Sequence, residues 1–453
     1  MQAIAVTGWL AMVNNWYKDQ EHSCGCEPLD IQLNAVDLTP YQEVYKKLLK
    51  DVYDGKIKQG DINSDLIRLT YQELHSGAST GYGKGFNVVG DNGKPNATVI
   101  KMKQNIFKFS GAKTYGQLVE LNQALNENGK PASWETFKTA GLGINEKYNL
   151  NYLQAEYQTA KQAGYNATNW ETYKRDIKLF PNLKYVTQND NRVRDEHRIL
   201  NGTIAPINGP FWAKYYPPNG WRCRCYTTQT AERVSDNIPD VVKEIAPEFT
   251  LNVGISGQVY NEGATGKPVP YFALAKKAGK QVQKGFEFAK FTAPYDEVQG
   301  IRISPFADTV DLEDNFVDAR VISKNHKLDV EIRPNVLIED WRNPELLING
   351  ILADRYAGSL KGGFAEKRKQ IKGFVKNYNE AFPDDKFTSQ YGIVFNVKSI
   401  DKDAARLING KFKNGKNLAF VIIVKGSKSV NIERADSFEI ITEKLKALKS
   451  QKD

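Results

Sequence analysis

Cysteine and histidine residues are the clearest candidate metal ligands in this sequence. Its four cysteines form two Cys-x-Cys pairs, Cys24/Cys26 and Cys223/Cys225. A disulfide between residues two apart is strained, so reduced thiols or metal ligands are expected instead. His197 precedes the second pair, and one imidazole with two thiolates is a ligand set that Zn²⁺ prefers. The residues His197, Cys223 and Cys225 therefore predict either a zinc site or buried cysteines and a hydrogen-bonded histidine packing an irregular loop.

The sequence leaves the rest of such a site open. Asp190 or Asp195 could serve as a fourth ligand. One histidine and a closed thiolate pair leave no free coordination position, which disfavours a metalloenzyme. His22, Cys24 and Cys26 form a second cluster. It could complete the same site, but an inert reduced pair in an N-terminal arm is the simpler interpretation.

A second set of candidate residues lies in a predicted hairpin. Two apolar runs meet at Asn349-Gly350, a dipeptide that readily adopts the positive φ of a tight turn. Glu345 begins one strand, while Asp354 and Tyr356 share a face of the other. Carboxylates placed in this way can hold Mg²⁺, which polarises a phosphate and generates hydroxide from water. The hairpin therefore predicts a phosphodiesterase site, against the alternative of ordinary exposed residues with Tyr356 packed on the sheet.

His326, in a lysine-rich turn before a strand, is a further candidate. It could act as the general base of a metal-free ribonuclease, although a lone histidine is more often a surface residue.

Residues 1–180, which precede His197 and the Cys223/Cys225 pair, are predicted to be mostly helical. One helix face is indicated by apolar spacing at Leu150, Leu153, Tyr157 and Ala160. The Gly- and Asn-rich segment 77–98 predicts a loop. Similar segments at Ser133 and Asn169 predict two helix starts, each with a capping residue.

The elements that carry the hairpin are predicted to form an α/β domain with a mixed sheet. Helices are expected at 310–324, 364–382, 401–412 and 436–449, and strands at 328–333, 345–349, 351–356, 391–397, 418–425 and 429–434. Residues 250–300 are predicted to be a loose exit from one domain and a basic connector to the next, with a boundary near residue 287. The expected domains are 1–130, 131–287 and 288–453.

Composition and charge limit the class of protein. A chain of 453 residues with 41% hydrophobic content can build two or three cores. The N-terminus lacks the charged region of a secretory signal, and no segment is apolar enough to span a membrane, so synthesis in the cytoplasm is expected. Residues 361–453 hold 20 Lys+Arg and 11 Asp+Glu, a net charge of +9. This basic end suits nucleic acid, or is a solubilising surface.

Residues 185–225 carry a pattern that identifies a family. The order runs from Tyr185 and Thr187 through Asp190, Val193, Arg194 and His197, then Phe211-Trp212 and Pro217-Pro218, to Cys223-Arg224-Cys225. This order resembles the signature of phage Mu protein F and related head morphogenesis proteins, over residues 140–275. The resemblance implies a minor head protein of a tailed bacteriophage with portal and capsid proteins as partners, located in the virion. It does not imply catalysis.

The C-terminal region has a second resemblance, over residues 310–435. Its hairpin is similar to restriction-endonuclease-like folds, in particular to the tRNA nuclease domains of contact-dependent inhibition toxins. Glu345 stands where the pattern has Asp, and Tyr356 stands where it has Lys. Arg355, Lys361 or Lys367 could supply the missing cation, and the candidate catalytic set is Glu345, Asp354, Tyr356 and Lys361.

Three functions remain open from the sequence. The first is a minor head protein carrying a Mg²⁺-dependent nuclease that acts on tRNA or DNA. The second is a structural head protein whose basic domain binds nucleic acid without catalysis. The third is a bacterial toxin with a domesticated phage module, for which an immunity protein would be a partner.

Overall fold

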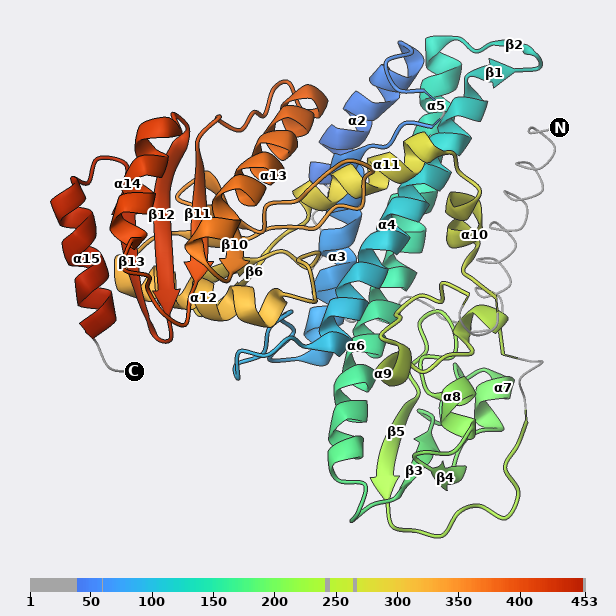
Figure 1. Ribbon diagram of the computed structural model, residues 1–453. Coiled ribbons are helices and arrows are strands. Elements are labelled where there is room, and N and C mark those ends of the chain that lie inside the picture. Colours follow the sequence, from blue (N-terminus) through green and yellow to red (C-terminus); the bar gives the residue numbers. More distant parts are fainter. Residues whose placement is uncertain (1–38, 59, 241–244, 264–266, 451–453) are drawn as a thin grey trace. The chain divides into compact units, whose positions relative to one another are not determined.

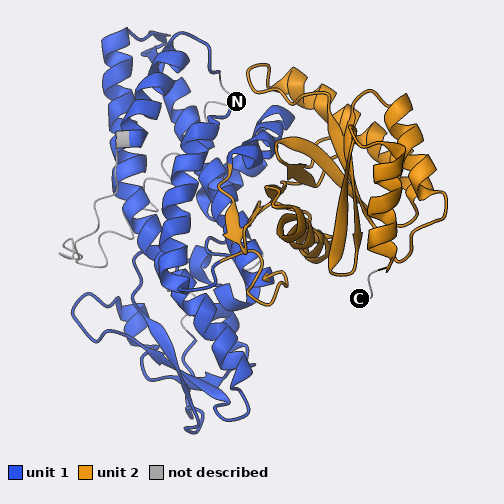
Figure 2. Ribbon diagram, turned by 90° about the vertical axis from the view of Figure 1, so that its left-hand side faces the viewer, with its two compact units in different colours: residues 1–86, 97–292 blue, residues 87–96, 293–453 orange. Residues whose placement is uncertain are grey.

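The computed structural model describes residues 39–58, 60–240, 245–263 and 267–450, so His22, Cys24 and Cys26 lie outside the described residues (Figure 1). The chain divides into two compact units. Unit 1 comprises residues 1–86 and 97–292, and unit 2 comprises residues 87–96 and 293–453 (Figure 2). Among the described residues, no helix combines the length and apolar character needed to cross a membrane.

Long helices form the first part of unit 1. They are α2 (Thr39–Tyr53), α3 (Ser64–Tyr82), α4 (Ala97–Ala124), α5 (Trp134–Asn145) and α6 (Leu153–Arg175). A short hairpin of β1 (Asn126–Glu127) and β2 (Lys130–Pro131) follows α4. Almost every residue of α4 from Val99 to Leu121 is buried, so this helix is surrounded by the rest of the unit.

Small residues let α3 and α6 approach each other closely. A Cβ atom at Gly81 would lie 1.8 Å from the backbone oxygen of Lys161, and one at Gly164 would lie 2.1 Å from that of Ala78. The predicted loop over 77–98 is therefore wrong at its start, because α3 continues to Tyr82. The glycines serve here as contact points between helices.

Two further expectations in this region are wrong. Leu150 is 47% exposed, because residues Glu146–Tyr152 form a π-helical turn that changes the angular spacing of the side chains. Asn169 lies inside α6, whereas Ser133 does cap α5 and accepts a hydrogen bond from the Thr136 N–H (3.2 Å).

The second part of unit 1 is a small sheet with short helices. Its strands are β3 (Asn182–Val186), β4 (Ile204–Pro206) and β5 (Tyr226–Thr230), in the antiparallel order β4-β3-β5. The short helices are α7 (Asp195–Arg198), α8 (Phe211–Tyr215), α9 (Val253–Ser256), α10 (Pro270–Lys276) and α11 (Lys280–Ala289), with 3-10 turns at Pro247–Phe249 and Lys290–Thr292. Trp212 is fully buried, and its indole N–H donates to the Ala205 carbonyl (3.1 Å).

The segment before unit 2 is more ordered than its composition predicts. We expected a loose connector over 250–300, but α10 and α11 occupy much of it. Phe286 of α11 lies against Gly111 of α4, and Gly285 lies against Ile62. These packing contacts hold the segment in unit 1.

Unit 2 is an α/β domain around one sheet of eight strands, which confirms the fold class expected from the sequence. The strand order is β13-β12-β11-β10-β9-β8-β7-β6. The strands are β6 (Asp296–Val298), β7 (Ile301–Ile303), β8 (Val330–Ile332), β9 (Leu346–Ile348), β10 (Ile351–Ala357), β11 (Tyr391–Asn396), β12 (Leu418–Lys425) and β13 (Lys428–Glu433). The pairs β10-β11, β11-β12 and β7-β8 are parallel, and the other four pairs of neighbouring strands are antiparallel.

Helices cover both faces of this sheet. They are α12 (Leu312–His326), α13 (Leu360–Ala381), α14 (Ala404–Asn414) and α15 (Phe438–Ser450). Arg355 of β10 pairs with Asp318 of α12, while its neighbour Asp354 pairs with Lys367 of α13. Because side chains alternate along a strand, α12 and α13 lie on opposite faces.

Two parts of unit 2 were not expected from the sequence. One is the hairpin of β6 and β7 at the edge of the sheet. The other is the segment 87–96, where the Val88 N–H donates to the buried Asp296 carboxylate (2.7 Å). Such pairings between distant parts of the chain leave little local pattern in a sequence.

Candidate functional site

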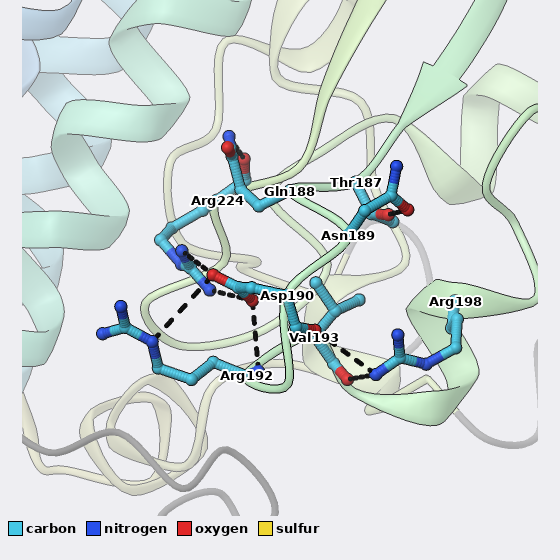
Figure 3. Close-up of polar contacts among 8 residues, drawn as sticks. All are labelled: Thr187, Gln188, Asn189, Asp190, Arg192, Val193, Arg198 and Arg224. Carbon is cyan, nitrogen blue, oxygen red and sulfur yellow. Dashed lines mark hydrogen bonds and ion pairs between the residues drawn. The ribbon is translucent and has the colours of Figure 1, made fainter.

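A charged clamp organises the loop after β3 (Figure 3). Asp190 accepts two hydrogen bonds from the Arg224 guanidinium, at 2.7 and 2.8 Å, and one from the Arg192 N–H at 3.1 Å. Arg224 is the largest cause that lowers the pKa of Asp190 to about 2. The clamp ties this loop to the Cys-Arg-Cys segment, 34 residues further along the chain.

Other polar contacts hold the same segment on α6. The Gln162 amide donates to the Cys225 carbonyl (3.0 Å), and the Arg222 N–H donates to the Thr159 hydroxyl (3.3 Å). On the loop, Arg198 donates to the Val193 carbonyl (2.9 Å) (Figure 3). Irregular backbone leaves many N–H and C=O groups without a partner in a helix or sheet. Side chains such as Gln162, Thr159 and Arg198 form hydrogen bonds with these groups here.

The structure brings His197, Cys223 and Cys225 together. All three are buried, and their ligand atoms lie within 4.8 Å of one another. The Nδ1 atom of His197 is 3.8 Å from Cys223 Sγ and 3.6 Å from Cys225 Sγ. A sulfur ligand at about 2.3 Å and a nitrogen ligand at about 2.0 Å from one tetrahedral Zn²⁺ stand about 3.5 Å apart. The separations therefore fit a shared zinc ion.

The surroundings orient the histidine in the way a metal ligand requires. His197 Nε2 is 3.2 Å from the Asn219 carbonyl oxygen. An N–H donated to this carbonyl leaves Nδ1 unprotonated toward the two sulfurs. The Asn219 side chain in turn accepts from the Tyr185 hydroxyl (2.9 Å).

The two thiols differ in their tendency to ionise. Burial raises the pKa of the Cys223 thiol, but the hydrogen bond from Cys225 opposes burial, and the pKa lies below its ordinary value. The hydrogen bond to Cys223, together with burial, raises the pKa of Cys225. One thiolate is thus already favoured, and thiolates are the form that binds metal.

Neither expected fourth ligand reaches the cluster. Asp190 is engaged by Arg224, and the side chain of Asp195 is 98% exposed. A cavity of about 20 Å³ next to the three residues leaves room for one ion or one water. The centre is buried and closed, which suits a structural role better than catalysis.

A buried ion pair near this segment was missed by the sequence analysis. Lys113 of α4 contacts Glu156 of α6, and both side chains are fully buried. The Tyr260 hydroxyl donates to the Glu156 carbonyl (2.9 Å). Lysine and glutamate within amphipathic patterns normally indicate an exposed face, so the sequence carries no signal for this pair.

The carboxylates of unit 2 occupy opposed positions in the β9-β10 hairpin. Leu346 pairs with Ala353, so Glu345 faces Asp354 in the same register. Asn349 and Gly350 both have positive φ, as the tight turn between the strands requires. Asp354 is fully buried and lies 3.2 Å from the Lys367 ammonium.

Burial changes the ionisation of both carboxyl groups. It raises the pKa of Glu345 to about 7, with a further contribution from Asp354. Burial also raises the pKa of Asp354 to about 6, against the opposing effect of Lys367. Raised carboxyl pKa values in a pair are typical of sites that bind a cation or transfer a proton.

Tyr356 and Lys361 make no hydrogen bond or ion pair with either carboxylate in the described structure. The Tyr356 ring packs against Phe395, with centroids 6.1 Å apart. Lys361 is exposed and lines a groove between α13 and α14. Arg355 points to the opposite face of the sheet and pairs with Asp318 (2.6 Å). Of the candidate cations, the structure thus places Lys367 beside Asp354.

His326 contacts a different part of unit 2, at strand β13. Its Nε2 is 2.9 Å from the Ser429 hydroxyl, which joins the end of α12 to β13. Burial lowers the pKa of His326.

Comparison with known proteins identifies part of unit 1. Residues 119–228 match the family described as Phage Mu protein F like protein. The Mu-like prophage FluMu F protein of Haemophilus influenzae is 34% identical over 80 residues, which are 18% of this chain and 19% of that protein. The "Putative capsid assembly protein F" of Escherichia phage Mu is 35% identical over 73 residues, 16% of this chain and 17% of that protein.

These matches cover less than a fifth of either relative. No solved structure matches the chain. The matched residues include both the Asp190–Arg224 clamp and the His197–Cys223–Cys225 cluster. Unit 1 therefore contains a segment that is similar to the Phage Mu protein F like family.

Proposed function

We propose that the protein takes part in assembly of the head of a tailed bacteriophage. The observation that carries this proposal is the family match over residues 119–228, together with a relative that is named as a capsid assembly protein. In this role the chain is a minor head protein, contacts portal and capsid proteins, and is found in the virion.

The His197–Cys223–Cys225 cluster would bind Zn²⁺ and keep the irregular segment rigid. His197, Cys223 and Cys225 would hold the ion, which would crosslink the segment when bound. The Asp190–Arg224 clamp and the Asn219 contact to His197 orient the same loop. A rigid loop is a suitable surface for docking on another head protein.

A complementation experiment tests the head role. A phage that lacks this gene is supplied with the full chain or with the variant His197→Ala/Cys223→Ser, and gradient-purified particles are analysed by mass spectrometry. We expect the chain in particles only when the cluster is intact. If purified particles contain none of the wild-type chain supplied, the proposal is wrong.

A second candidate function is supported by the β9-β10 hairpin. Glu345 and Asp354 are opposed, have raised pKa values and lie beside Lys367, a grouping that suits a Mg²⁺-dependent nuclease acting on tRNA or DNA. When bound, Mg²⁺ would polarise the phosphate. Lys367 stabilises the ionised form of Asp354 and offers the positive charge that Tyr356 cannot.

Incubation of the full chain with tRNA, single-stranded DNA and duplex DNA tests this second function. We expect cleavage with Mg²⁺, none with a chelator, and none for Glu345→Gln or Lys367→Ala. Helix α13, which carries Lys367, also carries the exposed residues Lys369 and Glu380. The variants Lys369→Ala and Glu380→Gln are therefore matched controls. Binding without cleavage would instead favour a non-catalytic nucleic-acid module. Growth inhibition relieved by a neighbouring gene product would favour a toxin with an immunity protein.

A further inference from the structure

A groove of about 540 Å³ lies between α13 and α14 of unit 2. One side is formed by Lys361, Phe364 and Arg368, which follow one another along a face of α13. The other is formed by Arg406 and Lys411 of α14. Each helix therefore presents two cationic side chains to the same groove.

The cations of the groove are largely uncompensated. Arg406 lies 3.9 Å from Asp403, the one acidic residue in the lining. In the part of the chain that the structure describes, Lys361, Arg368 and Lys411 have no carboxylate within ion-pairing distance. The sequence over 404–432 contains no Asp or Glu. With Asp403 as the one acidic residue in its lining, the groove therefore presents a net positive field.

The shape of the lining indicates how a ligand would be recognised. The aromatic side chains Phe364 and Tyr391 are only 4% and 3% exposed, so they offer no ring on which a base can stack. Lys411 is held over the Phe364 ring, 5.4 Å from its centroid. Lys361 and Arg368 are seven residues apart, about 10 Å along α13. This spacing suits two phosphates of one strand better than a single phosphate.

We propose that this groove binds the sugar–phosphate backbone of a nucleic-acid strand, without reading its bases. Phosphate contacts from lysine and arginine provide affinity and position a strand without sequence preference. The site goes beyond both proposed functions and does not depend on the carboxylate pair. Lys367 points from α13 to Asp354, whereas Lys361 and Arg368 line the groove.

Fluorescence anisotropy on the full chain tests the proposal. Labelled single-stranded RNA and DNA of twenty nucleotides are titrated in the presence of chelator, at several salt concentrations. The variant is Lys361→Gln/Arg368→Gln/Lys411→Gln. The control, Lys324→Gln/Lys446→Gln/Lys449→Gln, removes the same charge from exposed positions on α12 and α15. Thermal unfolding of both variants verifies that they fold.

We expect the groove variant to bind at least tenfold more weakly than the control variant. Its slope of log K against log salt is expected to be smaller by about 2, since each phosphate contact on a single strand contributes about 0.7. Glu345→Gln is expected to bind like the wild type, so loss of the nuclease proposal would leave this one standing. Equal loss in the two triple variants would overturn the proposal, because it would show attraction by net charge alone. Displacement of the strand by ATP at equal phosphate concentration would also overturn it, in favour of a free-nucleotide site.

Discussion

The His/Cys cluster of unit 1 and the carboxylate pair of unit 2 are built in opposite ways. His197 lies in the short helix α7 and the two cysteines in irregular backbone, and their geometry is fixed by the Asp190 and Arg224 side chains and by the Asn219 backbone carbonyl. The carboxylate pair lies in a regular hairpin, where strand register alone opposes Glu345 and Asp354. An irregular site therefore needs its own network of polar contacts, whereas a sheet supplies position without one.

The two sites also differ in their charge. In the cluster, thiols and imidazole face one another, and the nearby Asp190 is neutralised by Arg224. In the hairpin, burial raises the pKa of both carboxyl groups although Lys367 is close. We infer that a metal would add rigidity in the first site and relieve repulsion in the second.

Loss of the residues proposed to bind zinc is expected to have the largest effect. Cys223→Ser or a strong chelator should destabilise unit 1 by several kcal/mol, on the order of half of the 10–16 kcal/mol typical of structural zinc. Thermal unfolding with and without added Zn²⁺ measures this. Asp195→Asn is the control, since its side chain is 98% exposed and should not respond. If chelator does not change the stability of the wild type, the zinc proposal is wrong.

Breaking the buried ion pair is expected to be next in size. Lys113→Met should cost about 3 to 5 kcal/mol, because the buried Glu156 carboxylate loses the cation that balances its charge. The double variant Lys113→Met/Glu156→Met should recover most of this loss in chemical denaturation. If the double variant is as unstable as the sum of the singles, the pair is not coupled as we describe.

The carboxylate pair should make stability depend on pH in the neutral range. The pKa of Glu345 is raised from its ordinary value to about 7, so the folded protein binds more protons than the unfolded chain between about pH 4.5 and 7. Stability therefore falls as pH rises through this window. Glu345→Gln should be more stable than wild type by about 2 kcal/mol at pH 8 and nearly equal at pH 5. An identical difference at both pH values would contradict the raised pKa.

The smallest effect is expected for the clamp, because Asp190 is 33% exposed. Its pKa is lowered to about 2, so its contribution is present above the ordinary carboxyl pKa and is lost as pH falls from about 4 to 2. Asp190→Asn should cost about 1 kcal/mol at pH 7. Urea unfolding at pH 7 and pH 3 compares the two proteins, and an equal cost at pH 3 would argue against the ion pair.

The sequence predicts the sites and their scaffolds unequally. The elements of unit 2 from α12 onward follow their apolar periodicity closely, and Asn349-Gly350 marks the hairpin turn. Gly77 and Gly81 mislead, because glycine permits close helix contact as well as turns. Local patterns do not reveal which distant side chains meet. The sequence therefore did not single out Lys367 among the cations that could lie beside Asp354, and the Lys113–Glu156 pair was not predicted.

The most direct test of the account is whether the two sites can be separated in the assembled particle. The chain with His197→Ala/Cys223→Ser and the chain with Glu345→Gln/Asp354→Asn are each supplied to a phage that lacks the gene, and their amounts in purified particles are measured. The account predicts loss of incorporation for the cluster variant and normal incorporation for the carboxylate variant. Normal incorporation of the cluster variant, or exclusion of a folded carboxylate variant, would contradict it.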